Sequence, residues 1–72
     1  MQVQTEAEER AALAYEVGWL AKATMDLTGC MPRVIEKLME GDAFPGDRSA
    51  SELACLCRAI RAEHPNLDLG TP

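Results

Sequence analysis

Aromatic residues are scarce in this sequence: its 72 residues include one tyrosine, one tryptophan and one phenylalanine, which are Tyr15, Trp19 and Phe44. Any hydrophobic core must therefore be built almost entirely from aliphatic side chains. The length allows one domain at most, and a chain this short buries only about 60% of the surface of its unfolded state. A domain of that size often gains its remaining stability from disulfides, a metal ion or oligomerisation.

Clusters of basic residues are also missing, because the seven lysines and arginines are scattered along a chain whose net charge is −5. Proteins that bind a nucleic-acid backbone neutralise its phosphates with clustered lysine and arginine side chains. The composition therefore argues against direct nucleic-acid binding. An acidic chain suits a basic surface on a protein partner, and the simpler alternative is that its negative charge only keeps a small protein soluble.

Two further absences concern localisation. No run of about 20 apolar residues is available for a membrane span. The first twelve residues, MQVQTEAEERAA, are polar and acidic, whereas a secretion signal begins with a basic segment followed by an apolar one. Three cysteines, an odd number without a secretion signal, predict reduced thiols. We therefore expect a cytoplasmic protein that makes no membrane contact.

The residues that are abundant, alanine, leucine and glutamate, favour helix, and β-branched residues are few. Turn residues divide the chain into a helix over 5–28, a second over 32–40, a third over 49–64 and a flexible tail over 65–72. Thr5 suits the N-cap of the first helix, and Ser49 with Glu52 matches the capping box of the third. The prediction is a small all-α domain of three helices, with the long first helix as its central element.

The linker GDAFPGDRS, residues 41–49, contains two glycines and a proline and predicts a loop. Phe44 inside it is expected to fold back over the core. The loop is about twice as long as the 3–4-residue turn of a helix-turn-helix motif. In addition, the first turn of the third helix contains the acidic Glu52, whereas a helix that contacts DNA bases would carry lysine or arginine there. DNA binding therefore ranks third among the functions considered.

The most informative segment is AALAYEVGWLA, residues 11–21, which carries one charge, on Glu16, and is apolar on nearly every side. A helix at a protein surface usually has a single apolar stripe. At 100° per residue, one face of the first helix forms an ordinary core stripe, and the other two helices offer matching stripes. These stripes are Leu13, Val17, Leu20, Thr24 and Leu27 on the first helix, Val34, Ile35, Leu38 and Met39 on the second, and Leu53, Leu56, Cys57 and Ile60 on the third.

A second face of the first helix is lined by small residues and one methionine: Ala11, Ala14, Gly18, Ala21 and Met25. Small side chains let another helix approach closely, and glycine inside a helix costs about 1 kcal/mol relative to alanine. We interpret this face as the self-association surface of a helical homodimer. The alternative is that alanine serves here only as a good helix former on an exposed face.

The third face of the first helix combines two aromatic rings with charges: Tyr15, Trp19, Lys22 and Asp26. This mixture favours a recognition surface for a partner, because aromatic side chains bury a large area and keep a polar tip. The alternative is that both rings complete the core over the ends of the other helices. Glu16, between this face and the core stripe, is expected at the rim of the core with its carboxylate in water.

Motifs for catalysis or metal binding are absent from the sequence. Cys55 and Cys57 point about 200° apart on a helix, so they cannot chelate one metal ion. The only histidine, His64, suits the C-terminal end of the third helix, where a cation interacts favourably with the helix dipole. A pairing of His64 with a cysteine would need a spatial proximity that a sequence does not show. We expect no enzymatic activity, no metal and no cofactor.

Two functional hypotheses from different classes follow. The first is a small acidic adaptor or inhibitor that occupies a site on a larger protein. This chain is similar to phage-encoded inhibitors and small bacterial regulators in its size and charge, and the analogy extends no further. The second is a regulatory protein that binds a nucleotide or signal molecule at a subunit interface. In that case Arg33, Arg58 and Arg61 would contact the anion.

Overall fold

Three helices and no strand are present in residues 5–42 and 48–72, the residues that the structure, a computed structural model, describes. Helix α1 spans Glu6–Thr28, α2 spans Arg33–Glu40 and α3 spans Ala50–Glu63. The prediction of a small all-α domain with a long first helix is confirmed. Within the described ranges, no helix combines the length and the apolarity that crossing a bilayer requires. Phe44, the predicted cover of the core, lies outside the described residues.

Residues close in sequence set the ends of α1 and α3. The Thr5 hydroxyl accepts a hydrogen bond from the backbone N–H of Glu8 at 3.2 Å. Gly29 ends α1 in the left-handed conformation, at φ 78°, and its N–H donates to a carbonyl one turn back. At the start of α3, Ser49 and Glu52 form the predicted capping box, with a hydrogen bond in each direction.

The start of α2 is capped by a residue from another helix. Pro32, the N-cap of α2, makes no side-chain hydrogen bond. Instead Glu63, the last residue of α3, accepts from the backbone N–H of Arg33 at 2.8 Å and from that of Val34 at 3.1 Å. One carboxylate thus satisfies two of the N–H groups that a helix start leaves without an intrahelical partner. This contact joins α2 to the end of α3.

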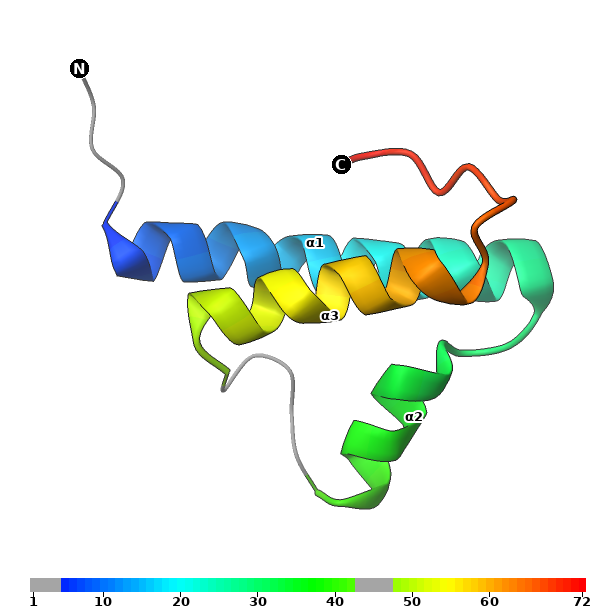
Figure 1. Ribbon diagram of the computed structural model, residues 1–72, viewed down its shortest axis with the longest axis horizontal. Helices are drawn as coiled ribbons and strands as arrows, with labels where there is room; N and C mark the ends of the chain where they lie inside the picture. Colours follow the sequence, from blue (N-terminus) through cyan, green and yellow to red (C-terminus); the bar gives the residue numbers. More distant parts are fainter. Residues whose placement is uncertain (1–4, 43–47) are drawn as a thin grey trace.

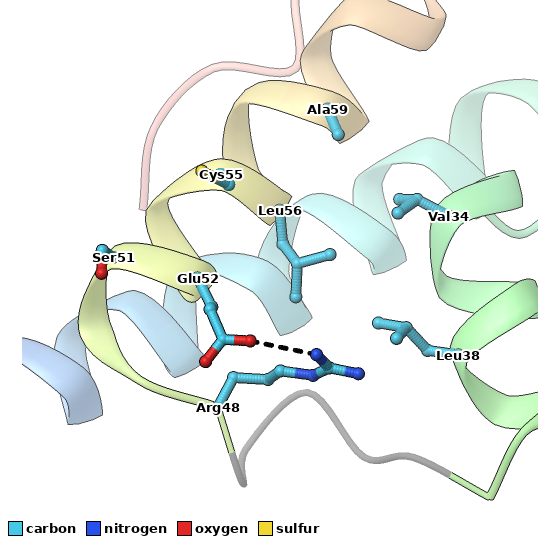
Figure 2. Close-up of a pocket in the computed structure, with 8 residues that line it drawn as sticks. All are labelled: Val34, Leu38, Arg48, Ser51, Glu52, Cys55, Leu56 and Ala59. Atoms are coloured by element: carbon cyan, nitrogen blue, oxygen red, sulfur yellow. Dashed lines mark hydrogen bonds and ion pairs between the residues drawn. The ribbon is translucent and has the colours of Figure 1, made fainter.

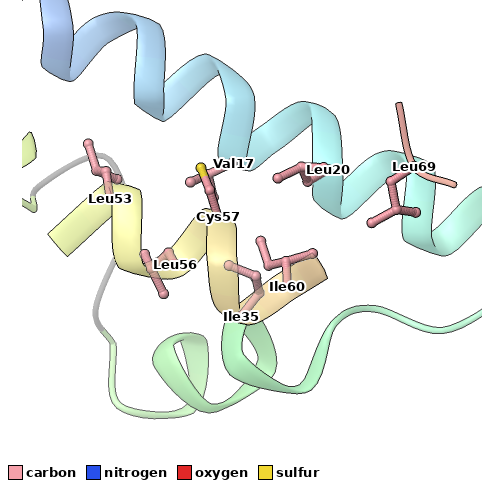
Figure 3. Packing of buried hydrophobic residues seen from close by; sticks show 8 residues of the cluster. All are labelled: Val17, Leu20, Ile35, Leu53, Leu56, Cys57, Ile60 and Leu69. Atoms are coloured by element: carbon pink, nitrogen blue, oxygen red, sulfur yellow. The ribbon is translucent and has the colours of Figure 1, made fainter. Parts of the chain in front are cut away.

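The central element of the fold is α3 (Figure 1). Helices α1 and α3 lie side by side and run in the same direction, while α2 leads the chain back and packs against α3. The prediction that the first helix is central is therefore wrong. The reason is that α3 buries residues toward both neighbours: Cys57 lies beside Val17 of α1, whereas Leu56 faces α2 (Figure 3).

The core is a single aliphatic cluster between the helices and the C-terminal tail (Figure 3). All four residues of the stripe predicted for the third helix are buried, and that prediction is confirmed. Thr24, the polar member of the α1 stripe, is also buried, and its hydroxyl donates to the Leu20 carbonyl at 2.8 Å. The buried hydrophobic residues are Val17, Leu20, Ile35, Leu53, Leu56, Cys57, Ile60 and Leu69.

Two residues assigned to the core stripes lie in solvent instead: Leu27 is 58% exposed and Met39 is 49% exposed. A heptad stripe drifts by about 20° per seven residues around a straight helix, and α1 is longer than its neighbour α3, with 23 residues against 14. Leu27 therefore rotates away from α3 near the end of α1. Met39 lies about 100° around α2 from Leu38, at the edge of its stripe.

The tail after α3 is not helical, but one of its side chains is anchored. The chain turns back along α1 (Figure 1), and Leu69 packs into the core with 5% of its surface exposed. The Asp68 carboxylate accepts a hydrogen bond from the N–H of Gly70 at 3.0 Å, and Gly70 turns the backbone at φ 73°. Within the segment 65–72, for which the sequence predicts a flexible tail, the burial of Leu69 anchors the chain against α1.

Candidate interaction surface

The side of α1 that faces away from the core is open to solvent. Its exposed residues recur every three or four positions and so form one stripe along the helix. Tyr15 is 67% exposed and Met25 is 45% exposed. We call this stripe the outer face of α1; it consists of Glu8, Ala11, Tyr15, Gly18, Lys22 and Met25.

Gly18, near the middle of the outer face, has no packing role within the chain. Apart from its chain neighbours and the backbone of its own helix, a Cβ atom at this position would meet no atom within 4 Å in the described structure. Glycine in a helix interior costs about 1 kcal/mol relative to alanine, and no close contact inside the chain requires it here. A packing reason for this glycine would have to come from another molecule.

Two shallow hollows lie on this side of α1. The first has a volume of about 390 Å³ and is lined by Ala14, Tyr15, Gly18, Trp19 and Lys22. The second, of about 240 Å³, lies nearer the start of the helix and is lined by Ala7, Arg10, Ala11 and Ala14. Ala14 lines both, so the two hollows are neighbours on α1.

The small-residue face predicted for self-association is open over only part of its width. Ala11, Gly18 and Met25 are exposed, whereas Ala14 and Ala21 are half-buried and pack against the core. The two inner alanines lie about 40–60° closer to the core side of the helix than Gly18 does. The exposed part of this face is therefore narrower than the sequence indicated.

The predicted aromatic face is divided by the fold. Trp19 is half-buried and packs against the core, and its ring lies 3.2 Å from the position that a Cβ of Gly70 would take. Tyr15 projects into solvent, and Lys22 and Asp26 are exposed with it. Trp19 thus completes the core beneath the tail, while Tyr15 is free to contact another molecule.

Three residues form a polar cluster where α1 meets α3. Arg61 Nη2 lies 3.8 Å from Glu16 Oε2, with both side chains about one-third exposed, so Glu16 occupies the predicted rim position. Cys57 is 5% exposed. Its burial, and secondly the neighbouring Glu16 carboxylate, raise the pKa of the Cys57 thiol to about 11.

We expect Cys57 to resist alkylation at neutral pH while Cys30 and Cys55, which are exposed, react readily. The thiolate is the nucleophile, and a pKa of about 11 leaves only about one Cys57 in 10⁴ ionised at pH 7. Mass spectrometry after brief iodoacetamide treatment should show two adducts, with the third only after denaturation. Three adducts on the folded protein would contradict the buried position of Cys57.

The three arginines predicted to hold an anion engage different neighbours. Arg61 pairs with Glu16 of α1. Arg58 donates from Nη2 to the Cys55 sulfur at 3.1 Å on the exposed side of α3. Arg33 begins α2. Within one chain, Arg58 and Arg61 therefore contact different side chains, and Arg33 lies on another helix.

An apolar groove of about 410 Å³, which was not predicted from the sequence, lies between α2 and α3 (Figure 2). Val34 and Leu38 line its α2 side and Leu56 its α3 side. An ion pair between Arg48 Nη1 and Glu52 Oε2, at 3.1 Å, lies on its rim. The groove depends on the angle between two helices, which the pattern of a single helix does not indicate. Residues 43–47, which link α2 to this rim, are outside the described ranges.

A further hollow, of about 430 Å³, lies where the ends of the three helices meet. Cys30, Met31, Arg33, Glu63 and His64 line it, so the only histidine and an exposed cysteine share one hollow. Both oxygens of Glu63 are already bonded to the backbone of α2. Among the described residues, no three side chains are grouped so that they could hold a metal ion.

Comparison with models of protein families, with curated proteins and with solved structures finds no match for this chain. Its function is therefore argued from the chemistry of its own surface.

Proposed function

We propose that this protein is a small helical interaction module, acting as an adaptor or inhibitor, that binds other protein chains through the outer face of α1. The observation that carries the proposal is the exposed Tyr15 ring beside the open backbone at Gly18. A large amphipathic ring and a hollow of about 390 Å³ thus lie next to each other on one rigid helix. Tyrosine is among the residues that most often dominate the energy of protein interfaces.

The rest of the outer face suits a helix as the bound element. Ala11 and Gly18 are small, so the backbone of a second helix can come close to α1. Glu8, Lys22 and Asp26 surround these apolar positions with exposed charges of both signs. Charged residues at the rim of an apolar patch fix orientation and exclude wrong partners more than they add affinity.

The DNA-binding hypothesis gains no support from the start of α3. Glu52, in the first turn, binds Ser49 through the capping box and Arg48 through the ion pair. Arg48, the cation nearest to the start of α3 among the described residues, is therefore paired with Glu52. A recognition helix would instead present its cations to the DNA bases at this position.

A capture experiment with two matched variants tests the proposed function. The immobilised protein should retain a stoichiometric partner from a lysate of its source cells. Tyr15→Ala should weaken that binding about thirtyfold, because removal of a central tyrosine typically costs about 2 kcal/mol or more. Met39→Ala is the control, since Met39 is also exposed but lies on α2. It should bind as the wild type does. Equal retention by Tyr15→Ala and wild type would refute the proposal, and loss with Met39→Ala would place the surface on α2.

A further inference from the structure

We propose that residues 65–72, the segment that follows α3, form a detachable strap whose Leu69–Gly70 pair occupies a docking site on α1. The strap leaves this site as a unit while the three helices stay folded, and an extended segment of another chain, with leucine followed by glycine, takes its place. The docking site lies beneath the strap, so the proposal goes beyond the proposed function, which rests on Tyr15 and Gly18 at the outer face of α1.

The strap is attached to the helices through two of its residues. Leu69 is buried in the core cluster and Gly70 is half-buried, whereas the other six residues of the strap are exposed. The strap runs back along α1 (Figure 1), and Leu69 joins the core side chains of the helices (Figure 3). The contact that holds the strap is therefore confined to one dipeptide.

The backbone of the strap adds nothing to this attachment. Leu67 donates its N–H to the His64 carbonyl at 3.0 Å, and Gly70 donates its N–H to the Asp68 carboxylate at 3.0 Å. Among the described residues, no hydrogen bond or ion pair joins the strap to a helix. Release of the strap thus breaks an apolar contact and leaves the helical hydrogen bonds intact. Regions held in this way open locally, at a lower free energy than global unfolding requires.

The docking site selects glycine after the buried leucine for two separate reasons. Gly70 has a φ of 73°, in the left-handed region that residues with a side chain rarely adopt. In addition, a Cβ at this position would lie 3.2 Å from the Trp19 ring, which is closer than most contacts of a Cβ. The strap itself therefore shows which ligand the site accepts, namely an extended segment with leucine followed by glycine.

Release of the strap would complete the aromatic face of α1. Trp19 is half-buried against Gly70, and Tyr15, about one helical turn earlier, is already exposed. Without the strap the two rings lie next to each other on one open face, as the sequence predicts. The closed strap is thus an autoinhibitory contact, because it covers Trp19 until a partner segment competes with Leu69 for the same place.

NMR spectra of the full chain test whether the strap leaves while the helices stay folded. In the wild type, the ring current of Trp19 should shift the α-proton resonances of Gly70, which lies against the indole. In Leu69→Ser these resonances should move to the values of an unstructured glycine, while the amide resonances in the first half of α1 keep their positions. Leu67→Ser makes the same change at an exposed residue of the strap and should leave the Gly70 resonances unchanged.

A peptide with the sequence of the strap, PNLDLGTP, tests the docking site. Added at millimolar concentration to the Leu69→Ser protein, it should shift the Trp19 indole resonance. It should bind the wild type at least about tenfold more weakly, because the strap already occupies the site and the apparent affinity falls with the fraction of open molecules. Control peptides that carry the Leu69→Ser or the Gly70→Ala change should leave the indole resonance in place.

Gly70→Ala in the full chain is a second way to release the strap, since it introduces strain at φ 73° and keeps Leu69. Loss of the helical amide pattern in both Leu69→Ser and Gly70→Ala would overturn the proposal, because the strap would then be an integral part of the core. Equal binding of the peptide to the wild type and to Leu69→Ser, or no binding to Leu69→Ser, would overturn it as well. None of these measurements uses a captured partner, so the strap and the proposed function stand or fail separately.

Discussion

Replacing Leu20 with alanine is expected to lower the free energy of unfolding by about 3 kcal/mol, which leaves much of the chain unfolded at 37 °C. Leu20 is fully buried at the contact between α1 and α3. Removing a buried leucine side chain costs 2–5 kcal/mol, because apolar burial is lost and the cavity closes only in part. A single core of this size supplies only about 3–5 kcal/mol in total. Urea unfolding followed by circular dichroism measures the change.

Leu27→Ala is the matched control for this experiment. Leu27 belongs to the same predicted stripe of α1, but it is 58% exposed because the stripe drifts away from α3 toward the end of the helix. Its replacement should change the free energy of unfolding by no more than about 0.5 kcal/mol. Similar losses from Leu20→Ala and Leu27→Ala would mean that the core extends to the end of α1, contrary to the structure.

Replacing Glu63 with alanine is expected to cost about 2 kcal/mol and to loosen the start of α2. Hydrogen bonds to a charged group contribute about 1.5–3 kcal/mol, and loss of an N-cap acceptor costs about 0.5–2 kcal/mol. Glu63 supplies both acceptors at this helix start, to Arg33 and Val34. Hydrogen exchange of these two amides should accelerate in the variant, and the unfolding midpoint in urea should fall.

Two further variants define the cause of that loss. Glu63→Gln keeps one acceptor oxygen without the charge, so we expect about half of the effect. Glu36→Ala removes a carboxylate from the first turn of α2 itself, where it is exposed. This control should change the free energy of unfolding by at most about 0.5 kcal/mol. Unchanged exchange at Arg33 and Val34 in Glu63→Ala would exclude the capping role.

Sequence reasoning located the helix ends that depend on nearby residues. Thr5 and the Ser49–Glu52 capping box act within a few positions of the ends that they fix, so short motifs were sufficient. The start of α2 is different, since its cap is Glu63, 30 residues away from Arg33. No local motif marks such a contact, because it exists only once α2 and α3 have packed.

The location of the candidate surface on α1 was predictable from the sequence, but the width of that surface was not. The apolar character of α1 on nearly every side indicated a second contact, and Tyr15 and Gly18 are exposed as that contact requires. The separation of Trp19 from Tyr15 was not predictable, because it depends on the tail that carries Leu69. Helical periodicity does not apply to an irregular segment, so a single buried side chain there leaves no pattern to recognise.

The position of Trp19 also makes it an intrinsic fluorescence probe for the C-terminal tail. It is the only tryptophan, and its ring lies against Gly70, next to the buried Leu69. Detachment of the tail would bring water to the indole and shift its emission to longer wavelengths, while the far-ultraviolet dichroism of the three helices would stay the same. Fluorescence and dichroism recorded on one sample would therefore distinguish release of the chain end from unfolding of the whole domain, without any added label.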